Sequence, residues 1–91
     1  MTWFLYVNMD TTAKQIKRMM KQFVNRKIHD MQLVVPRENN RKFHDSLSFE
    51  KMILKNGETL LLQLRTEGTD NFEPIESIAG NYDTILAALL N

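Results

Sequence analysis

The sequence contains no cysteine among its 91 residues. This absence excludes disulfide bonds, zinc ribbons, thiolate nucleophiles and thiol redox switches. No apolar run approaches the roughly 18 residues that a membrane-spanning helix needs. The first seven residues lack a basic region before their apolar stretch, and the chain turns polar at Asn8, which is not typical of a signal peptide. We therefore expect a cytoplasmic protein without a membrane span.

Glycine is also scarce, with three well-separated residues, so no Gly-rich phosphate-binding loop is predicted. His29 and His44 are the only histidines, and no further ligands stand at metal-binding spacing from them. Asp30 and Asp45 each follow a histidine, but no nucleophile is placed to complete a catalytic dyad. We expect a protein that is not an enzyme and that uses no metal and no cofactor.

The composition is that of one small globular domain, with 43% apolar and 25% charged residues. The charge is uneven: residues 1–45 hold nine basic and four acidic residues, and residues 46–91 hold three and seven. Six basic residues and no acidic one lie between Lys14 and Lys27. This run indicates either a solvated helix face or a patch for an acidic partner. The acidic second half argues against a dedicated nucleic-acid binder.

One amphipathic helix is predicted near the N-terminus. Thr12 and Gln15 fit a capping box, which places the helix start there and its end at about Arg26. The apolar stripe of this helix contains Ala13, Ile16, Met20 and Phe23, with Met19 and Val24 widening it. Four basic residues fall largely off the stripe, namely Lys14, Lys17, Arg18 and Lys21. The helix therefore has one dry face and one positive face.

Three apolar segments predict strands. Trp3 to Val7 has the compact apolar character of a buried strand, and Met31 to Val35 is a second strand that ends at Pro36. Glu58 to Arg65 is the strongest strand signal and follows the Asn56-Gly57 turn. Period-two alternation places Leu60, Leu62 and Leu64 on one face of that strand, toward the helix.

The remaining segments are shorter. Residues 43–44 predict a brief strand, residues 46–54 a turn or short 3₁₀ segment, and residues 72–78 an extended segment. Tyr82 to Leu90 is interpreted as a short helix with Ile85, Leu86, Leu89 and Leu90 on its apolar side. Such a helix is marginal alone in water, so it must pack onto its own domain, a second copy or a partner.

This order of elements resembles ubiquitin and the wider β-grasp superfamily. The residues that carry the resemblance are Phe49 to Ile53, Leu54, the turn Lys55-Asn56-Gly57-Glu58, Thr59 to Arg65 and, upstream, Leu5, Val7, Thr12 and Leu33 to Val35. The resemblance implies an α+β fold with a ubiquitin-like β-grasp sheet packed on one amphipathic helix. This core would span residues 1–68, and residues 69–91 would form a C-terminal extension that ends in a short helix.

Two features depart from the family pattern. The usual N-terminal hairpin has two strands before the helix, and this chain has room for one. Trp3 to Val7 could be the central strand of a smaller sheet, or the gap could be filled by the segment near Ile75 or by a second chain. There is no Gly-Gly terminus either, which argues against conjugation. The chain is similar in size to the YukD-like ubiquitin-like proteins associated with type VII secretion, which also lack a conjugating tail and are not enzymes.

The resemblance implies a non-catalytic adaptor or accessory domain that binds a protein partner, in a bacterial secretion-associated complex if the YukD-like similarity holds. Ubiquitin-like domains commonly bind through the outer sheet face, whose matching positions here are Val34, Leu61 and Gln63. The basic helix face, with Lys14, Lys17, Arg18 and Lys21, is the second predicted partner surface. A homodimer through the C-terminal extension is a further expectation.

Two alternatives stay open at this point. The first is a small regulatory nucleic-acid-binding protein, whose affinity would fall steeply with salt. It would use Lys14, Lys17, Arg18, Lys21, Arg26 and Lys27. The second is a domain unrelated to ubiquitin, in which the C-terminal strand and helix belong to the core. Truncation after Gly68 distinguishes this second alternative from the others, because the fold should collapse if the C-terminal segment is part of the core.

Overall fold

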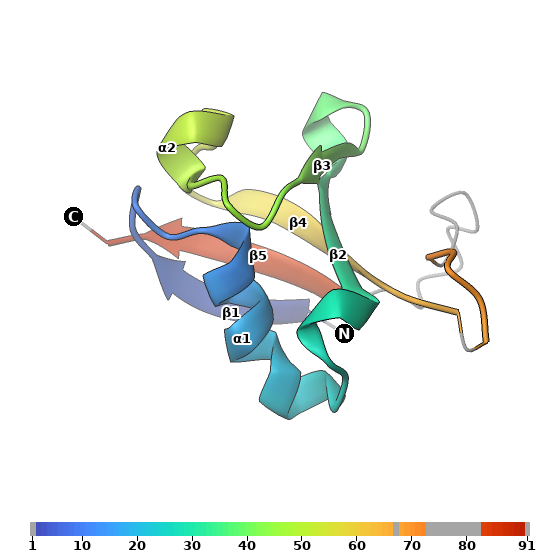
Figure 1. The fold of residues 1–91 in the computed structure, drawn as a ribbon. Helices are drawn as coiled ribbons and strands as arrows, with labels where there is room; N and C mark the ends of the chain where they lie inside the picture. Colours follow the sequence, from blue (N-terminus) through green and yellow to red (C-terminus); the bar gives the residue numbers. More distant parts are fainter. Residues whose placement is uncertain (1, 67, 73–82, 91) are drawn as a thin grey trace.

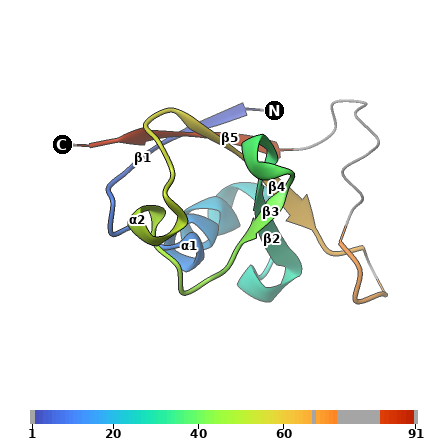
Figure 2. The same cartoon turned by 90° about the horizontal axis from the view of Figure 1, so that it is seen from above.

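The computed structural model describes residues 2–66, 68–72 and 83–90. Within them the chain forms an α+β fold, in which a mixed sheet carries its helices on one face (Figures 1 and 2). In chain order the elements are β1 (Thr2–Val7), α1 (Ala13–Val24), the 3₁₀ turn η1 (Ile28–Asp30), β2 (Met31–Val35), the 3₁₀ turn η2 (Pro36–Glu38), β3 (Arg41–Phe43), α2 (Phe49–Met52), β4 (Glu58–Leu64) and β5 (Asp83–Leu89).

The sheet has five strands in the order β1-β5-β4-β2-β3. β1 runs parallel to β5, and the other neighbouring pairs are antiparallel. β1 and β3 are therefore the two edge strands. β5 comes last along the chain but lies inside the sheet, between β1 and β4 (Figure 1).

The position of β5 corrects one prediction. The predicted helix over Tyr82 to Leu90 is wrong, because Asp83–Leu89 is a strand. Ile85 and Ala87 alternate into the core, where both are fully buried. A central strand is apolar on both faces, so its spacing also fits a short helix. β5 lies between β1 and β4, whereas Ile75 and most of the predicted extended segment lie outside the described residues. The sheet thus takes strands from both sides of residue 68.

The capping box of α1 is confirmed. The Gln15 backbone N–H donates to Thr12 Oγ1 at 3.3 Å, and Gln15 Oε1 accepts from the Thr12 backbone N–H at 2.8 Å. The helix ends at Val24, two residues before the predicted end, because Asn25 adopts the left-handed conformation with φ 54°. Ile16 and Met20 are fully buried and fix α1 against the sheet.

The predicted leucine face of β4 is also confirmed. Leu60 and Leu62 are buried in the core cluster, and Leu64 is partly buried against it. Burial of each such side chain stabilises the fold by about 1.5–3 kcal/mol. Phe43 of β3 and Phe49 of α2 belong to the same core. Their rings pack edge to face, with centroids 5.7 Å apart.

The polar turn before β4 is hydrogen-bonded to the end of β5. Gly57 has φ 76°, which its missing side chain permits. Its N–H donates to the Ala87 carbonyl at 2.9 Å, and Asn56 Oδ1 accepts from the Leu89 N–H at 2.9 Å. The turn thus holds the end of β5 as well as the start of β4.

The smaller predictions have mixed outcomes. The brief strand at residues 43–44 corresponds to β3, which lies slightly earlier, and residues 46–54 contain the one-turn helix α2. Ser48 caps α2 by accepting from the Lys51 N–H at 3.2 Å. In the described part of the chain, no helix is long and apolar enough to cross a membrane.

Candidate functional site

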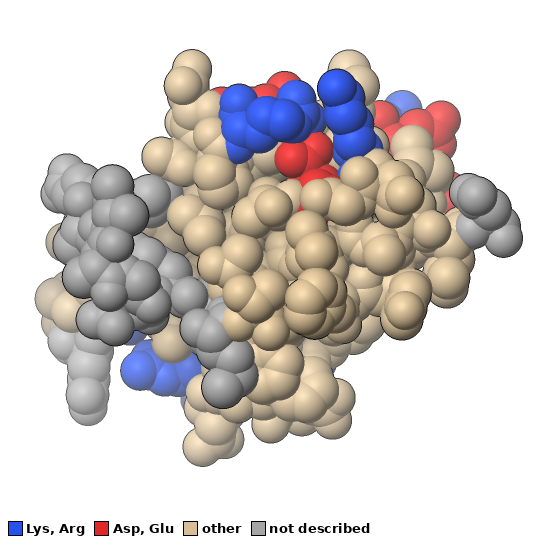
Figure 3. All heavy atoms as spheres, turned by 180° about the vertical axis from the view of Figure 1, so that it is seen from behind, with Lys and Arg blue, Asp and Glu red and all other residues tan. Residues whose placement is uncertain are grey.

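The outer face of the sheet, opposite α1 and α2, is the main candidate site. Strand registers place one set of alternating residues on this face. They are Thr2, Phe4 and Tyr6 on β1, Thr84, Leu86 and Ala88 on β5, Thr59, Leu61 and Gln63 on β4, Gln32 and Val34 on β2, and Lys42 on β3. Seen from this side in Figure 3, charged groups gather along the upper margin with one basic group below, and the broad described area between them carries none.

The two large aromatic side chains of this face are open to solvent. Phe4 is 72% exposed and Tyr6 is 70% exposed. Their cross-strand neighbours Leu86 and Ala88 are partly exposed. We call these four residues the outer patch. A contiguous apolar patch without charges is typical of a protein-binding surface, whereas single exposed apolar residues are ordinary.

Sequence reasoning missed the outer patch because Trp3 to Val7 was expected to be a buried strand. Only one face of β1 is covered: Val7 is buried, and Leu5 is partly buried against the core. The missed signal is the strand's alternation, which places Phe4 and Tyr6 together on the opposite face. Since every residue from Trp3 to Val7 is apolar or aromatic, hydropathy alone does not show which side is covered.

The predicted outer-face residues do not form an open patch. Val34 is 1% exposed and Gln63 is 5% exposed, so both are buried, contrary to expectation. Gln63 Oε1 accepts from Gln32 Nε2 at 2.8 Å. Leu61 is partly buried between Val34 and its other cross-strand neighbour Thr84. Of the three, Leu61 alone retains partial exposure.

Of the four basic residues predicted to form the helix face, the fold exposes three and buries one. Lys14, Arg18 and Lys21 are exposed as predicted. Lys17 is not available to a partner, because its side chain is buried and Nζ pairs with Asp45 Oδ1. Position 17 adjoins the buried stripe of α1, which explains why its charge is used internally.

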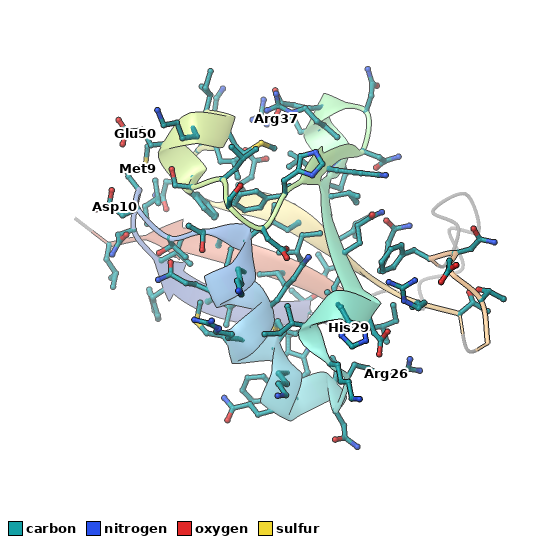
Figure 4. The ribbon with its side chains drawn as sticks, in the orientation of Figure 1. Met9, Asp10, Arg26, His29, Arg37 and Glu50 are labelled. Atoms are coloured by element: carbon teal, nitrogen blue, oxygen red, sulfur yellow. The ribbon has the colours of Figure 1, made fainter. Side chains whose placement is uncertain are left out.

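A shallow depression at the C-terminal end of α1 brings part of the basic run together. Its lining includes Arg18, Lys21, Arg26 and Lys27 and contains no acidic residue. Figure 4 shows Arg26 at this end of the molecule, far from Arg37 beside η2. Arg26 Nη1 donates to the Arg65 carbonyl at 3.4 Å, and no acidic side chain of the described residues pairs with the other three. Lys14 and Lys17 are not part of this lining.

A two-point ion pair between Arg37 and the buried Glu58 lies away from both surfaces. Arg37 donates to the Glu58 carboxylate from Nη2 at 2.8 Å and from Nε at 3.0 Å. The Glu58 side chain is only 4% exposed and also accepts from the Lys55 N–H at 3.2 Å. The Arg37 hydrogen bond lowers the pKa of Glu58 and outweighs the opposing effect of burial. The pair joins η2 to the start of β4, so its position indicates a structural role.

Among the described residues, no group of three or more His, Cys, Asp or Glu side chains is arranged to hold a metal ion. His29 Nε2 lies 3.5 Å from Asp30 Oδ1, but that carboxylate also accepts from Arg65 Nε at 3.1 Å. Asp45 is paired with Lys17 rather than with its neighbour His44. Both carboxylates that directly follow a histidine therefore have cationic partners.

Comparisons with protein-family models, curated proteins and solved structures found no match to this chain. The described residues define its class as an α+β protein with a mixed five-stranded sheet.

Proposed function

We propose that the protein is a non-catalytic protein-interaction domain of ubiquitin-like type that binds a protein partner through the outer face of its sheet. The observation that carries this proposal is the outer patch, where two aromatic side chains about 70% exposed stand on an uncharged part of that face. Burial of each of these side chains by a partner would contribute about 1.5–3 kcal/mol. Aromatic residues are the commonest anchors of protein interfaces.

The topology supports the ubiquitin-like part of the proposal. A mixed sheet grasps α1, and β2, β3, α2 and β4 follow in the order that the resemblance implies. In this reading β5 occupies the position that the family gives to its first strand, and it enters from the C-terminal end of the chain. β1 then stands where the family has the second strand of its hairpin, but it runs parallel to β5, whereas the two strands of a hairpin are antiparallel. The secretion-associated setting rests on the similarity in size to the YukD-like proteins.

The test is affinity capture from native lysate with a matched pair of arginine variants. Leu86→Arg places a charge in the centre of the outer patch, and Ile53→Arg places one at a site that is 77% exposed and away from that face. We expect a protein partner that is retained at high salt by the wild type and by Ile53→Arg and is lost from Leu86→Arg. Equal capture by all three proteins would refute the outer face as the binding surface.

A second candidate function is supported by the basic depression at the end of α1. Its four cations could bind a polyanion such as nucleic acid, although Lys21 also interacts favourably with the helix C-terminus. Binding of this kind weakens steeply with salt because phosphate contacts release counterions. Capture of nucleic acid that is lost at high salt and in Arg18→Glu, but kept in Leu86→Arg, would favour this function over the first.

A further inference from the structure

The two edges of the sheet differ in their protection against pairing with another strand. β3 has three residues, two of which are the exposed basic residues Arg41 and Lys42. β1 has six residues, with the sequence Thr-Trp-Phe-Leu-Tyr-Val, and contains no charge, proline or glycine. Native sheets usually protect an edge by a short strand, charged side chains, proline or a bulge. β1 has none of these features.

The outward-facing backbone of β1 has no partner among the described residues. The Val7 carbonyl accepts from the Leu90 N–H at 2.7 Å, so the backbone of Val7 faces β5. Backbone direction alternates along a strand, and the N–H and C=O groups of Thr2, Phe4 and Tyr6 therefore point to the free edge. No hydrogen bond within the described part of the chain reaches these groups. They form a row of donors and acceptors that matches another extended strand.

The part of α1 nearest this edge is also uncharged. Phe23 stacks on Trp3 with ring centroids 4.5 Å apart, and it remains 49% exposed. Met19 and Gln15 lie four and eight residues earlier, on the same row of the helix, and both line a depression beside the loop that follows β1. The exposed basic residues of α1 lie on other rows. The edge thus continues from the β1 backbone onto an uncharged helix surface.

We propose that the β1 edges of two copies of this chain pair antiparallel, about a twofold axis at Phe4, and join the two sheets into one. In this register Phe4 lies opposite its counterpart, and Thr2 lies opposite Tyr6 of the second copy. All three outward-facing residues then form hydrogen-bonded pairs, which gives about six backbone hydrogen bonds at two per pair. Registers centred on other residues of β1 pair fewer of these groups.

A second copy fits this edge better than an unrelated extended segment does. The twofold axis brings Phe4 opposite Phe4, and aromatic cross-strand pairs are favourable. The absence of charge on β1 removes the like-charge repulsion that usually opposes self-pairing. The same axis places both α1 helices on one face of the joined sheet, with the rows of Met19 and Phe23 toward each other. An added strand alone would leave those side chains uncovered.

This association uses the β1 edge, whereas the proposed partner binding uses the outer face, so purified protein tests it separately. We expect sedimentation equilibrium of the full chain to show a monomer–dimer equilibrium from low micromolar to near-millimolar concentration. Phe4→Lys should be monomeric over the same range, and Ile53→Lys, which replaces an exposed apolar residue away from the edge, should dimerise like the wild type. Circular dichroism checks that each variant is folded. A wild type that stays monomeric, or a Phe4→Lys variant that still dimerises, overturns the proposal.

Disulfide trapping tests the register, because the chain has no cysteine of its own. Residues directly opposite in a hydrogen-bonded pair lie about 5.5 Å apart at Cα, within the roughly 4.4–6.8 Å that a disulfide spans. Phe4→Cys should therefore form a covalent dimer rapidly under mild oxidation. Tyr6→Cys is the matched control on the same strand, since its counterpart would lie about four residues, or ~13 Å, away. Equal or faster trapping of Tyr6→Cys would overturn the proposed register.

Discussion

The two edge strands of this sheet are held in place by different kinds of interaction. Near β3, Arg37 binds the buried Glu58 carboxylate, and Arg41 pairs with Glu38 and donates to the Met52 carbonyl at 2.8 Å. β1 has no ion pair among the described residues and depends on its ladder with β5 and on apolar contacts with the core. Ion pairs and hydrogen bonds of charged side chains thus hold the β3 edge in place. The apolar edge depends on β5 for its place in the sheet and keeps its other side open.

The largest effect should come from removing β5. A chain that stops after Gly68 would lose the strand between β1 and β4, together with the fully buried Ile85 and Ala87. β1 would have no ladder partner, and the core would be open along the whole strand. We expect this chain to show no cooperative unfolding transition by circular dichroism. A cooperative transition at the wild-type temperature would show that residues 1–68 fold independently.

The next largest effect should come from Ile85→Ala. Ile85 is fully buried and pairs with Trp3 on one side and Leu60 on the other. Its truncation should lower the free energy of unfolding by about 2–4 kcal/mol, through lost burial and the cavity that remains. Urea denaturation measures this change. Leu90→Ala is the control, because that side chain is 60% exposed and its loss should cost less than about 0.5 kcal/mol.

Sequence patterns predicted the segments whose faces differ in polarity or whose ends carry specific caps. Thr12 and Gln15 located the start of α1, and the alternation in β4 identified Leu60 and Leu62 as core residues. β5 was predicted as a helix because its apolar residues satisfy both periodicities. Its identity depends on a place between β1 and β4 that local sequence does not encode.

The candidate site was harder to predict for a related physical reason. Exposure on a sheet depends on strand order, which was not deduced from the sequence. Val34 and Gln63 alternate as expected, yet both are buried, while Thr59 on the same face is exposed. Phe4 and Tyr6 have more apolar character, yet their strand is at the edge and leaves them open. The burial of Lys17 was not predicted for a similar reason. Its partner Asp45 is distant in sequence, so the ion pair is visible only in the folded chain.

A smaller effect is expected at the charged side of the sheet. Glu58→Gln keeps the size of the side chain but removes the charge that Arg37 binds, and it should lower the free energy of unfolding by about 1–2 kcal/mol at neutral pH. The pKa of Glu58 is lowered in the folded protein from its ordinary value of 4.5, so its carboxylate stabilises the fold above that pH. This stabilisation is lost as pH falls through the lowered pKa. Denaturation of both proteins across pH 7 to pH 3 should therefore show their difference constant above about pH 4.5 and shrinking steadily below it. A difference that is constant with pH would contradict a charge-based role.

The smallest effect should come from Lys42→Thr, which keeps the length of β3 and removes its lysine charge, while Arg41 stays paired with Glu38. Lys42 is exposed and stands opposite Val34, so the change should alter the free energy of unfolding by less than about 0.5 kcal/mol. If length is sufficient, three residues offer too few backbone groups for stable pairing, and sedimentation should show the same association as the wild type. New, larger assemblies in this variant would instead show that the lysine charge keeps β3 from pairing. Combining Lys42→Thr with Phe4→Lys makes the comparison sharper, because any association that remains must then use the β3 edge or the face of the sheet.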